Sequence, residues 1–368
     1  MKVGIAGYGS TKFSTDDIPL ESILLESTIE LFNNIQNLDQ NDIDVVLVST
    51  NNDSKYLGPI LSELVGIKPQ ISHTVESLCN SGTNAIVSAY SYLASGLART
   101  ALVVGADRFD SPGQILRWDN SRGEFKHPIF WASIFAKSYK RKYNVSSQDL
   151  AYISVKNHKF AQENPYAYSK KQYSVEDVLE SKELTDDIRL LDCSRPCTGG
   201  SAVLLSNNDT INKFTDTPVW LTGIGQKNTS ASFTKNPSFV SMESTRIASE
   251  NAFQIASTSP NKVDVAEIHD AFSVCEPLAL ESLGFIEKGR GTEFSKQLLE
   301  TNDRRINPRG GIIGSGHPLG ATGISQTIEI AEQLQGKAKK RQVDHPRIGL
   351  VHNMSAAATS STVLLFQN

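Results

Sequence analysis

VGIAGYG, at Val3–Gly9, is an apolar segment that ends in glycines, and VWLTGIG, at Val219–Gly225, has a similar pattern later in the chain. A second apolar segment follows each of them: DVVLVS at Asp44–Ser49 and VDVAEI at Val263–Ile268. Continuous apolar runs of this length are typical of strands that are covered on both faces, as in a parallel sheet. The recurrence therefore predicts an α/β protein built from two similar halves.

A third pair of segments extends the pattern: ALVVGA at Ala101–Ala106 corresponds to IGLVH at Ile348–His352. Between the first two strands, apolar residues spaced for one helix face predict a helix from Leu20 to about Asn37. Helices that alternate with buried strands indicate a layered α/β fold. We expect the two halves to span residues 1–215 and 216–368.

Residues 107–190 differ in composition, because they are rich in aromatic, Lys, Ser and Asn residues and lack long apolar strands. We expect a helical or irregular excursion over the surface of the first half, and long insertions of this kind are often functional. Its basic residues Arg117, Arg122 and Lys137 are candidate ligands for an anionic group, although a solvated surface position is the simpler interpretation of each.

The overall composition excludes several classes of protein. The chain has 368 residues, 36 Lys+Arg against 40 Asp+Glu, and four cysteines. A formal charge of −4 argues against broad nucleic-acid binding. No apolar run approaches a membrane span, the start MKVGIAGYGS has no secretory apolar region, and four cysteines make no disulfide scaffold in so long a chain. We expect a reduced, cytoplasmic protein with no nucleic-acid or membrane partner.

Three local patterns have ordinary explanations. The glycine-rich stretches at Gly4–Ser10 and Gly223–Asn228 lack the complete G-x-G-x-x-G spacing, so tight strand exits are favoured over dinucleotide sites. Cys193 and Cys197 could form a metal pair, but no second pair with suitable spacing lies near them. We expect two reduced cysteines there, and neither a metal nor a bound cofactor.

Cys79 and three histidines carry the chemical signal. Cys79 precedes a predicted helix, Thr83–Leu93, whose positive end favours the thiolate, the nucleophilic form; a buried small apolar residue is the alternative. His317 lies in a glycine-dense loop before a helix that starts at about Ala321, which suits a general base. His269 and His352 each end a predicted strand, where α/β sites form. One cysteine and three histidines at such places, drawn from both halves, suggest acyl transfer through cysteine.

The chain resembles the thiolase superfamily, and most closely its sterol-carrier-protein-2-like and archaeal acetyl-CoA acetyltransferase branch. The resemblance lies in segments that span nearly the whole chain: SLCNSGTNAI around Cys79, CSRPCTGGSAVLL from Cys193, AEIHDAFSVCEPLALESLGF from Ala266, NPRGGIIGSGHPLGATG from Asn307 and LVHNMSAAATSS from Leu350. It implies two repeated βαβαβαββ halves in a five-layered α/β/α/β/α core, with residues 107–190 as an inserted loop domain that holds coenzyme A.

The family roles carry over to the matching positions. Cys79 would take the acyl group as a thioester, and His317 would activate Cys79 and donate to the thioester oxygen. His269 would help to form the oxyanion hole for the enolate. Backbone N–H groups of Cys79 and near Met354 would bind the other oxyanion. The expected reaction is the reversible Claisen condensation of acetyl-CoA to acetoacetyl-CoA, with the coenzyme A thioester as substrate rather than cofactor.

The sequence departs from the family where most thiolases carry a second catalytic cysteine, which moves the proton on the α-carbon. The two places where that cysteine occurs hold His352 and Ala271 here. We favour His352 for the proton role because imidazole titrates in the working range. Cys275, one helical turn beyond Ala271, is the alternative. A third interpretation is that the chain is not a competent thiolase.

Two further functions stay open: a ketoacyl-synthase-like condensing enzyme that uses malonyl substrates, and a non-catalytic, coenzyme-A-binding scaffold. The resemblance also implies a homodimer or homotetramer. It makes a complex with 3-hydroxy-3-methylglutaryl-CoA synthase and a small OB-fold, zinc-ribbon protein a plausible expectation.

Overall fold

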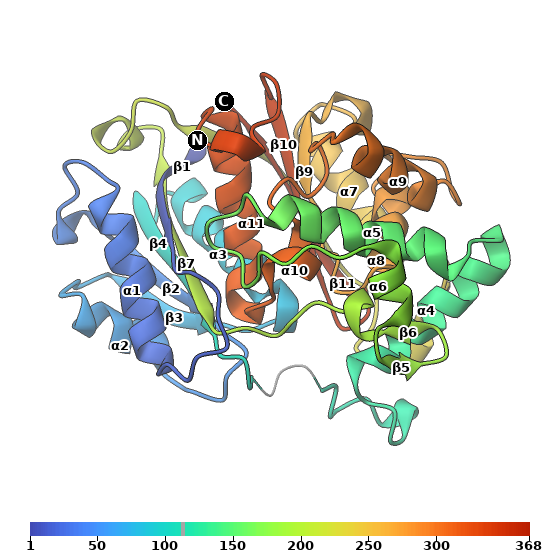
Figure 1. The fold of residues 1–368 in the computed structure, drawn as a ribbon. Coiled ribbons are helices and arrows are strands. Elements are labelled where there is room, and N and C mark those ends of the chain that lie inside the picture. The colour runs from blue at the N-terminus through green and yellow to red at the C-terminus, as the bar shows by residue number, and fades with distance from the viewer. Residues whose placement is uncertain (112–114) are drawn as a thin grey trace.

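A computed structural model describes residues 1–111 and 115–368, so three residues of the predicted insertion lie outside the described part. A nine-stranded sheet runs through the molecule in the order β3-β2-β4-β7-β1-β8-β11-β10-β9 (Figure 1). Its strands are β1 (Val3–Ser10), β2 (Val45–Ser49), β3 (Ile71–Val75), β4 (Thr100–Asp107), β7 (Gly199–Asn207), β8 (Val219–Asn228), β9 (Val265–Glu267), β10 (Ile348–Ser355) and β11 (Ser360–Gln367). A separate two-stranded sheet joins β5 (Glu183–Thr185) to β6 (Ile188–Arg189).

The strand order confirms the repeat. β1 and β8 meet antiparallel in the middle of the sheet, with Gly4 opposite Trp220. Outward from this seam, the first half continues with β7, β4 and β2, and the second half continues with β11, β10 and β9. In both halves the order is therefore the last strand, the strand predicted third and the strand predicted second. The strands predicted second and third pair in parallel in both halves, β2 with β4 and β9 with β10. In the second half, Ile306 forms a parallel bridge to Ala266, at the place that β3 takes in the first.

The helices are α1 (Leu20–Asn33), α2 (Leu57–Leu64), α3 (Ser81–Ala94), α4 (Pro128–Tyr143), α5 (Ser147–Ala161), α6 (Val175–Glu180), α7 (Glu243–Ile255), α8 (Cys275–Ser282), α9 (Gly291–Thr301), α10 (Gly311–Ser315) and α11 (Leu319–Leu334). Helix α1 ends four residues before the predicted Asn37. No helix among the described residues is long and apolar enough to cross a membrane.

The side chains of β2 show why its sequence is apolar throughout. Val45 and Leu47 face the central helices α3 and α11, whereas Val46 and Val48 face α1 and α2 on the outside. The second half repeats this arrangement, with α7 and α8 on its outer face. The two halves of the nine-stranded sheet therefore form two layers, with helices between them and on both outer faces, as expected for the thiolase fold.

Glycines allow α11 to lie directly against the first half. A Cβ on Gly323 would come within 2.7 Å of the Thr83 backbone nitrogen, and one on Gly320 within 2.6 Å of the Ser49 carbonyl oxygen. Real Cβ atoms do not approach backbone this closely, so α11 packs on α3 and β2 only because these residues are glycine. This contact brings the starts of α3 and α11 together, and with them the segments that carry Cys79 and His317 (Figure 1).

The insertion packs differently from the prediction. Its described part is mainly helical, as expected, but α5 lies against α9 and α10, and α4 shares a core with α7 and α8. It therefore covers the second half rather than the first. Buried polar contacts between α5 and α8, including Lys156 Nζ to Glu276 Oε2 at 3.2 Å, hold it there. Sequence periodicity does not reveal such nonlocal partners.

Candidate active site

Cys79 lies in a short 3₁₀ turn, Leu78–Asn80, immediately before α3. Leu78 adopts a left-handed φ of 52°, which is strained for a residue with a branched side chain. Three hydrogen bonds hold this conformation: the Leu78 carbonyl accepts from Ser81 Oγ at 2.6 Å and from Asn51 Nδ2 at 2.9 Å, and its N–H donates to Glu76 Oε1 at 2.7 Å. A turn fixed this firmly orients the adjacent sulfur.

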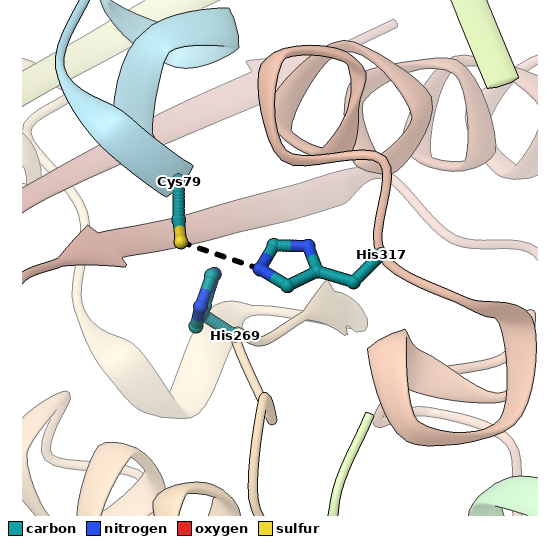
Figure 2. A group of neighbouring side chains, drawn as sticks. All are labelled: Cys79, His269 and His317. Carbon is teal, nitrogen blue, oxygen red and sulfur yellow. Dashed lines mark hydrogen bonds between the residues drawn. The ribbon is translucent and has the colours of Figure 1, made fainter. Parts of the chain in front are cut away.

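His317 reaches Cys79 from the loop between α10 and α11. Its Nε2 lies 3.3 Å from Cys79 Sγ, and its backbone N–H donates to the Arg195 carbonyl at 2.8 Å (Figure 2). The helix after it starts at Leu319, two residues before the predicted position. The sulfur and the imidazole, 238 residues apart in sequence, thus lie within hydrogen-bonding distance.

Thr322 determines which nitrogen of His317 is free. The Thr322 hydroxyl donates to the Pro318 carbonyl at 2.9 Å, and its oxygen lies 2.7 Å from His317 Nδ1. Because the hydroxyl has one proton and gives it to Pro318, it accepts from Nδ1–H. Nε2 is then unprotonated and faces the thiol, which is the arrangement that a general base requires.

Thr322→Val is expected to lower the turnover number by roughly 10- to 100-fold, the rate equivalent of leaving a buried N–H unpaired at about 1–3 kcal/mol. The valine keeps the shape but cannot hold the Nδ1–H tautomer. Steady-state kinetics and alkylation of Cys79 by iodoacetamide should both slow down, while Thr322→Ser should retain most of the wild-type rate. Equal rates in the valine variant and the wild type would show that this hydroxyl does not position the base.

His269 completes the group. It follows β9, is 2% exposed, and its ring stands nearly perpendicular to that of His317 with the centroids 5.4 Å apart. One ligand atom from each of Cys79, His269 and His317 lies within 4.8 Å of the other two (Figure 2). The neighbouring Asp270 anchors the loop before α10, accepting from the Ile312 N–H at 2.6 Å and the Ile313 N–H at 3.3 Å. The predicted convergence of one sulfur with two imidazoles is present.

The three side chains open into a cavity of about 230 Å³. The insertion and both halves contribute to its wall, which is mainly apolar: Leu116, Ile129, Trp131, Leu184, Phe272 and Met354. A mostly apolar wall with a few convergent polar groups is typical of a small-molecule site. Met354, whose predicted role is to offer a backbone N–H, is one of the lining residues.

Beside Met354, three consecutive alanines have left-handed backbones: Ala356, Ala357 and Ala358, with φ of 47°, 63° and 57°. This conformation costs an L-residue roughly 1–2 kcal/mol. Ala356 and Ala357 line the cavity, so the strained segment forms part of its wall. Strain retained at such a place is typical of a functional site.

The protonation states differ from the prediction. Burial, with a smaller effect from the Asp107 carboxylate, raises the pKa of the Cys79 thiol to about 12. Burial, followed by Arg309, lowers the pKa of His317 to about 3. Burial and the neighbouring imidazoles likewise lower the pKa of His269 well below its ordinary value. Desolvation therefore opposes the helix dipole, which by itself favours the thiolate, and a neutral thiol facing a neutral imidazole is the favoured resting state.

Alkylation of Cys79 should consequently become faster with pH over the whole range from about pH 6 to about pH 10, by up to about tenfold per unit. The raised thiol pKa leaves a small thiolate fraction at neutral pH, and that fraction grows until the pH approaches the pKa. Iodoacetamide labelling followed by peptide mass spectrometry measures this, with Cys79→Ser as the control. A rate that is flat across neutral pH would instead indicate a thiolate–imidazolium pair.

Two predicted proton carriers do not line the cavity formed by the described residues. His352 is fully buried, and its Nε2 lies 3.0 Å from Thr245 Oγ1. Cys275, at the start of α8, is also fully buried.

Among the basic candidates of the insertion, Arg122 is 7% exposed and stacks 5.1 Å from the centre of the Phe233 ring, whereas Arg117 and Lys137 are exposed.

Cys193 lines the cavity, which the sequence did not indicate. Local spacing suggested only a reduced cysteine in a pair with Cys197. Cys197 is indeed buried, but Cys193 is partly exposed. Its place follows from an antiparallel bridge to Phe272, a contact between segments 79 residues apart that no local pattern encodes.

A thiol that faces a neutral imidazole base in an apolar cavity defines a site for nucleophilic acyl transfer. Comparison with known proteins agrees. The family described as "Thiolase C-terminal domain-like" matches residues 225–368. An acetyl-CoA acetyltransferase from Methanothermobacter thermautotrophicus is 31% identical, over 99% of each chain. Human sterol carrier protein 2 is 29% identical over 76% of this chain, which covers 55% of that protein.

Among solved structures, the Ltp2-ChsH2(DUF35) aldolase superposes with a TM-score of 0.88 at 19% identity, covering 100% of this chain and 97% of the other. That likeness concerns the fold. The identity to the archaeal enzyme over nearly the full length of both chains goes further: the chain belongs to the thiolase superfamily, as an acyltransferase of its archaeal and sterol-carrier-protein-2-like branch.

Proposed function

We propose that the protein is an acetyl-CoA C-acetyltransferase that interconverts two molecules of acetyl-CoA with acetoacetyl-CoA and coenzyme A. The observation that carries the proposal is the 3.3 Å contact between Cys79 Sγ and the unprotonated Nε2 of His317, open to an apolar cavity. The likeness to the archaeal acetyltransferase supports the choice of acyl group.

In the direction of cleavage, Cys79 attacks the 3-keto carbon while His317 Nε2 takes the thiol proton. Attack and proton transfer occur together, because a thiol with a pKa of about 12 is not ionised beforehand. The bond between C2 and C3 then breaks, leaving an acetyl thioester on Cys79 and an acetyl-CoA enolate. Coenzyme A takes the acetyl group in the second half-reaction, and the departing sulfur regains its proton from His317.

Two oxyanions need donors in this sequence. We assign the enolate oxygen to His269, whose lowered pKa keeps it a neutral N–H donor. The tetrahedral oxyanion is assigned to backbone N–H groups of Cys79 and Met354, two residues that line the cavity. Loss of one such donor typically lowers the rate by about 10²–10³.

Coenzyme A and protein partners form part of the proposal. The insertion would hold coenzyme A, because Leu116, Ile129 and Leu184 lie at the cavity. β3 is a partly exposed edge strand that a second copy could extend, which supports a homodimer. The name of the Ltp2-ChsH2(DUF35) aldolase joins two components, and this supports a small partner protein here. Light scattering of the purified chain alone tests the homodimer. Light scattering of the material co-purified from its source tests the partner protein.

The deciding experiment measures loss of acetoacetyl-CoA and release of coenzyme A with purified enzyme. Acetoacetyl-CoA, a longer 3-ketoacyl-CoA and malonyl-CoA are compared, because the apolar wall also suits larger acyl groups. Thiolysis of acetoacetyl-CoA supports the proposal. Activity that depends on malonyl-CoA would favour the synthase alternative, and no turnover with any of them would favour a scaffold.

A further inference from the structure

The cavity holds more titratable groups than the acyl-transfer step uses. Among the described residues that line it, these groups are Cys79, His127, Cys193, His269 and His317. The proton of Cys79 passes to His317, and His269 is assigned to an oxyanion. His127 is exposed, at the N-cap of α4, where its side chain accepts from the Ile129 N–H at 3.3 Å. Cys193 is left without a role.

Cys193 is held in place on both sides. The Ser194 N–H donates to the Ala271 carbonyl at 2.9 Å, and the Ser273 N–H donates to the Asp192 carbonyl at 2.8 Å. These bonds set Cys193 opposite Phe272, two residues after the Asp270 that anchors the base-bearing loop. The thiol therefore sits on a rigid segment that is tied to the catalytic loops of the second half.

The four cysteines divide by exposure. Cys197 and Cys275 are buried, whereas Cys79 and Cys193 are partly exposed, and both of these line the same cavity. Ala271, which precedes the Phe272 that pairs with Cys193, carries only a methyl group. A second thiol therefore lines the cavity of the nucleophile, next to a side chain without polar atoms, with its Sγ 3.4 Å from the Arg189 carbonyl oxygen.

We propose that Cys193 is the acid and base that transfers the proton of the substrate α-carbon. This role rests on the proposed thiolysis. His317 holds the proton that Cys79 must regain, and a second donor for the enolate carbon leaves that proton in place for the return. Cys193 is the partly exposed titratable group on the cavity that has no other role.

The step balances as follows. When the C2–C3 bond breaks, its electron pair stays with the enolate, and C2 takes the proton of the Cys193 thiol, which becomes a thiolate. Acetyl-CoA leaves. The Cys193 thiolate then takes the proton of incoming coenzyme A, whose sulfur attacks the acetyl group on Cys79. Burial raises the pKa of Cys193 to about 12, so the thiol is protonated when the enolate forms.

The test uses Cys193→Ala, with Cys275→Ala as the matched control. Three quantities are measured: acetoacetyl-CoA thiolysis, exchange of acetyl-CoA α-hydrogens with D₂O, and acetylation of Cys79 by acetyl-CoA. Cys193→Ala is expected to lower thiolysis and exchange by at least about 100-fold, as for loss of a general acid. Acetylation of Cys79 should fall much less than thiolysis and exchange, because coenzyme A can also depart as a thiolate, and the acetylated peptide demonstrates an intact fold. Cys275→Ala should retain all three.

The proposal is overturned if Cys193→Ala keeps thiolysis and exchange, or if Cys275→Ala or His352→Asn loses exchange while Cys193→Ala retains it. A wild type that exchanges α-hydrogens without cleaving acetoacetyl-CoA overturns the proposed substrate, yet loss of that exchange in Cys193→Ala would still support the proton role. A wild type with neither activity overturns both.

Discussion

Replacement of Cys79 by alanine is expected to lower acetoacetyl-CoA thiolysis on the order of 10³-fold or more, because the variant cannot form the thioester intermediate. Incubation of the wild type with acetyl-CoA should add the mass of one acetyl group to the peptide that contains Cys79. The alanine variant should add none. Intact-protein and peptide mass spectrometry measure the adduct, and the release of coenzyme A measures the rate.

The size of this effect follows from the position of the sulfur, which faces His317 Nε2 at 3.3 Å. Alanine also leaves the Leu78 turn intact, since the bonds from Ser81 and Asn51 go to the Leu78 carbonyl and not to the sulfur. A folded variant without activity is therefore the expected result. Acetylation at another residue, with turnover retained, would contradict the assigned nucleophile.

Much of this site follows from sequence because its residues lie at the ends of predictable elements. Cys79 precedes an amphipathic helix, His269 follows an apolar strand, and the glycines around His317 anticipate the close packing of α11. Convergence then follows from the repeat, since strands with the same role in each half lie at equivalent places in the sheet.

What the sequence left open depends on contacts between distant segments. Burial decides the charge of Cys79, and a helix-end argument does not include it. Cross-segment pairing decides that Cys193 reaches the cavity while His352 bonds to Thr245 instead. The insertion was expected over the surface of the first half, and a local pattern does not show that α5 instead buries polar residues such as Lys156 against the second half.

Lys156→Met is therefore expected to destabilise the fold by about 3–5 kcal/mol, the usual effect of removing one partner from a buried ion pair. Lys156 Nζ lies 3.2 Å from Glu276 Oε2, and both side chains are fully buried. Without the ammonium, Glu276 keeps only neutral donors, from Asn157, Ser295 and Asn307. Urea unfolding followed by circular dichroism measures the change. Lys296→Met removes a half-exposed ammonium that lies 3.9 Å from Glu300 and 4.7 Å from the centre of the Tyr152 ring, and it should shift stability by no more than about 1 kcal/mol.

The double variant Lys156→Met with Glu276→Gln separates charge from packing. If the loss comes from an unpaired buried carboxylate, the uncharged pair should recover most of the stability, because two neutral groups avoid that desolvation cost. If the lysine stem mainly fills space, the glutamine should recover nothing. Since Asn157 Nδ2 also donates to Asp270 Oδ2 at 2.7 Å, the cluster connects α5 to the loop of His269. We therefore expect the single variant to lose activity at urea concentrations below its unfolding midpoint, and the double variant to regain it.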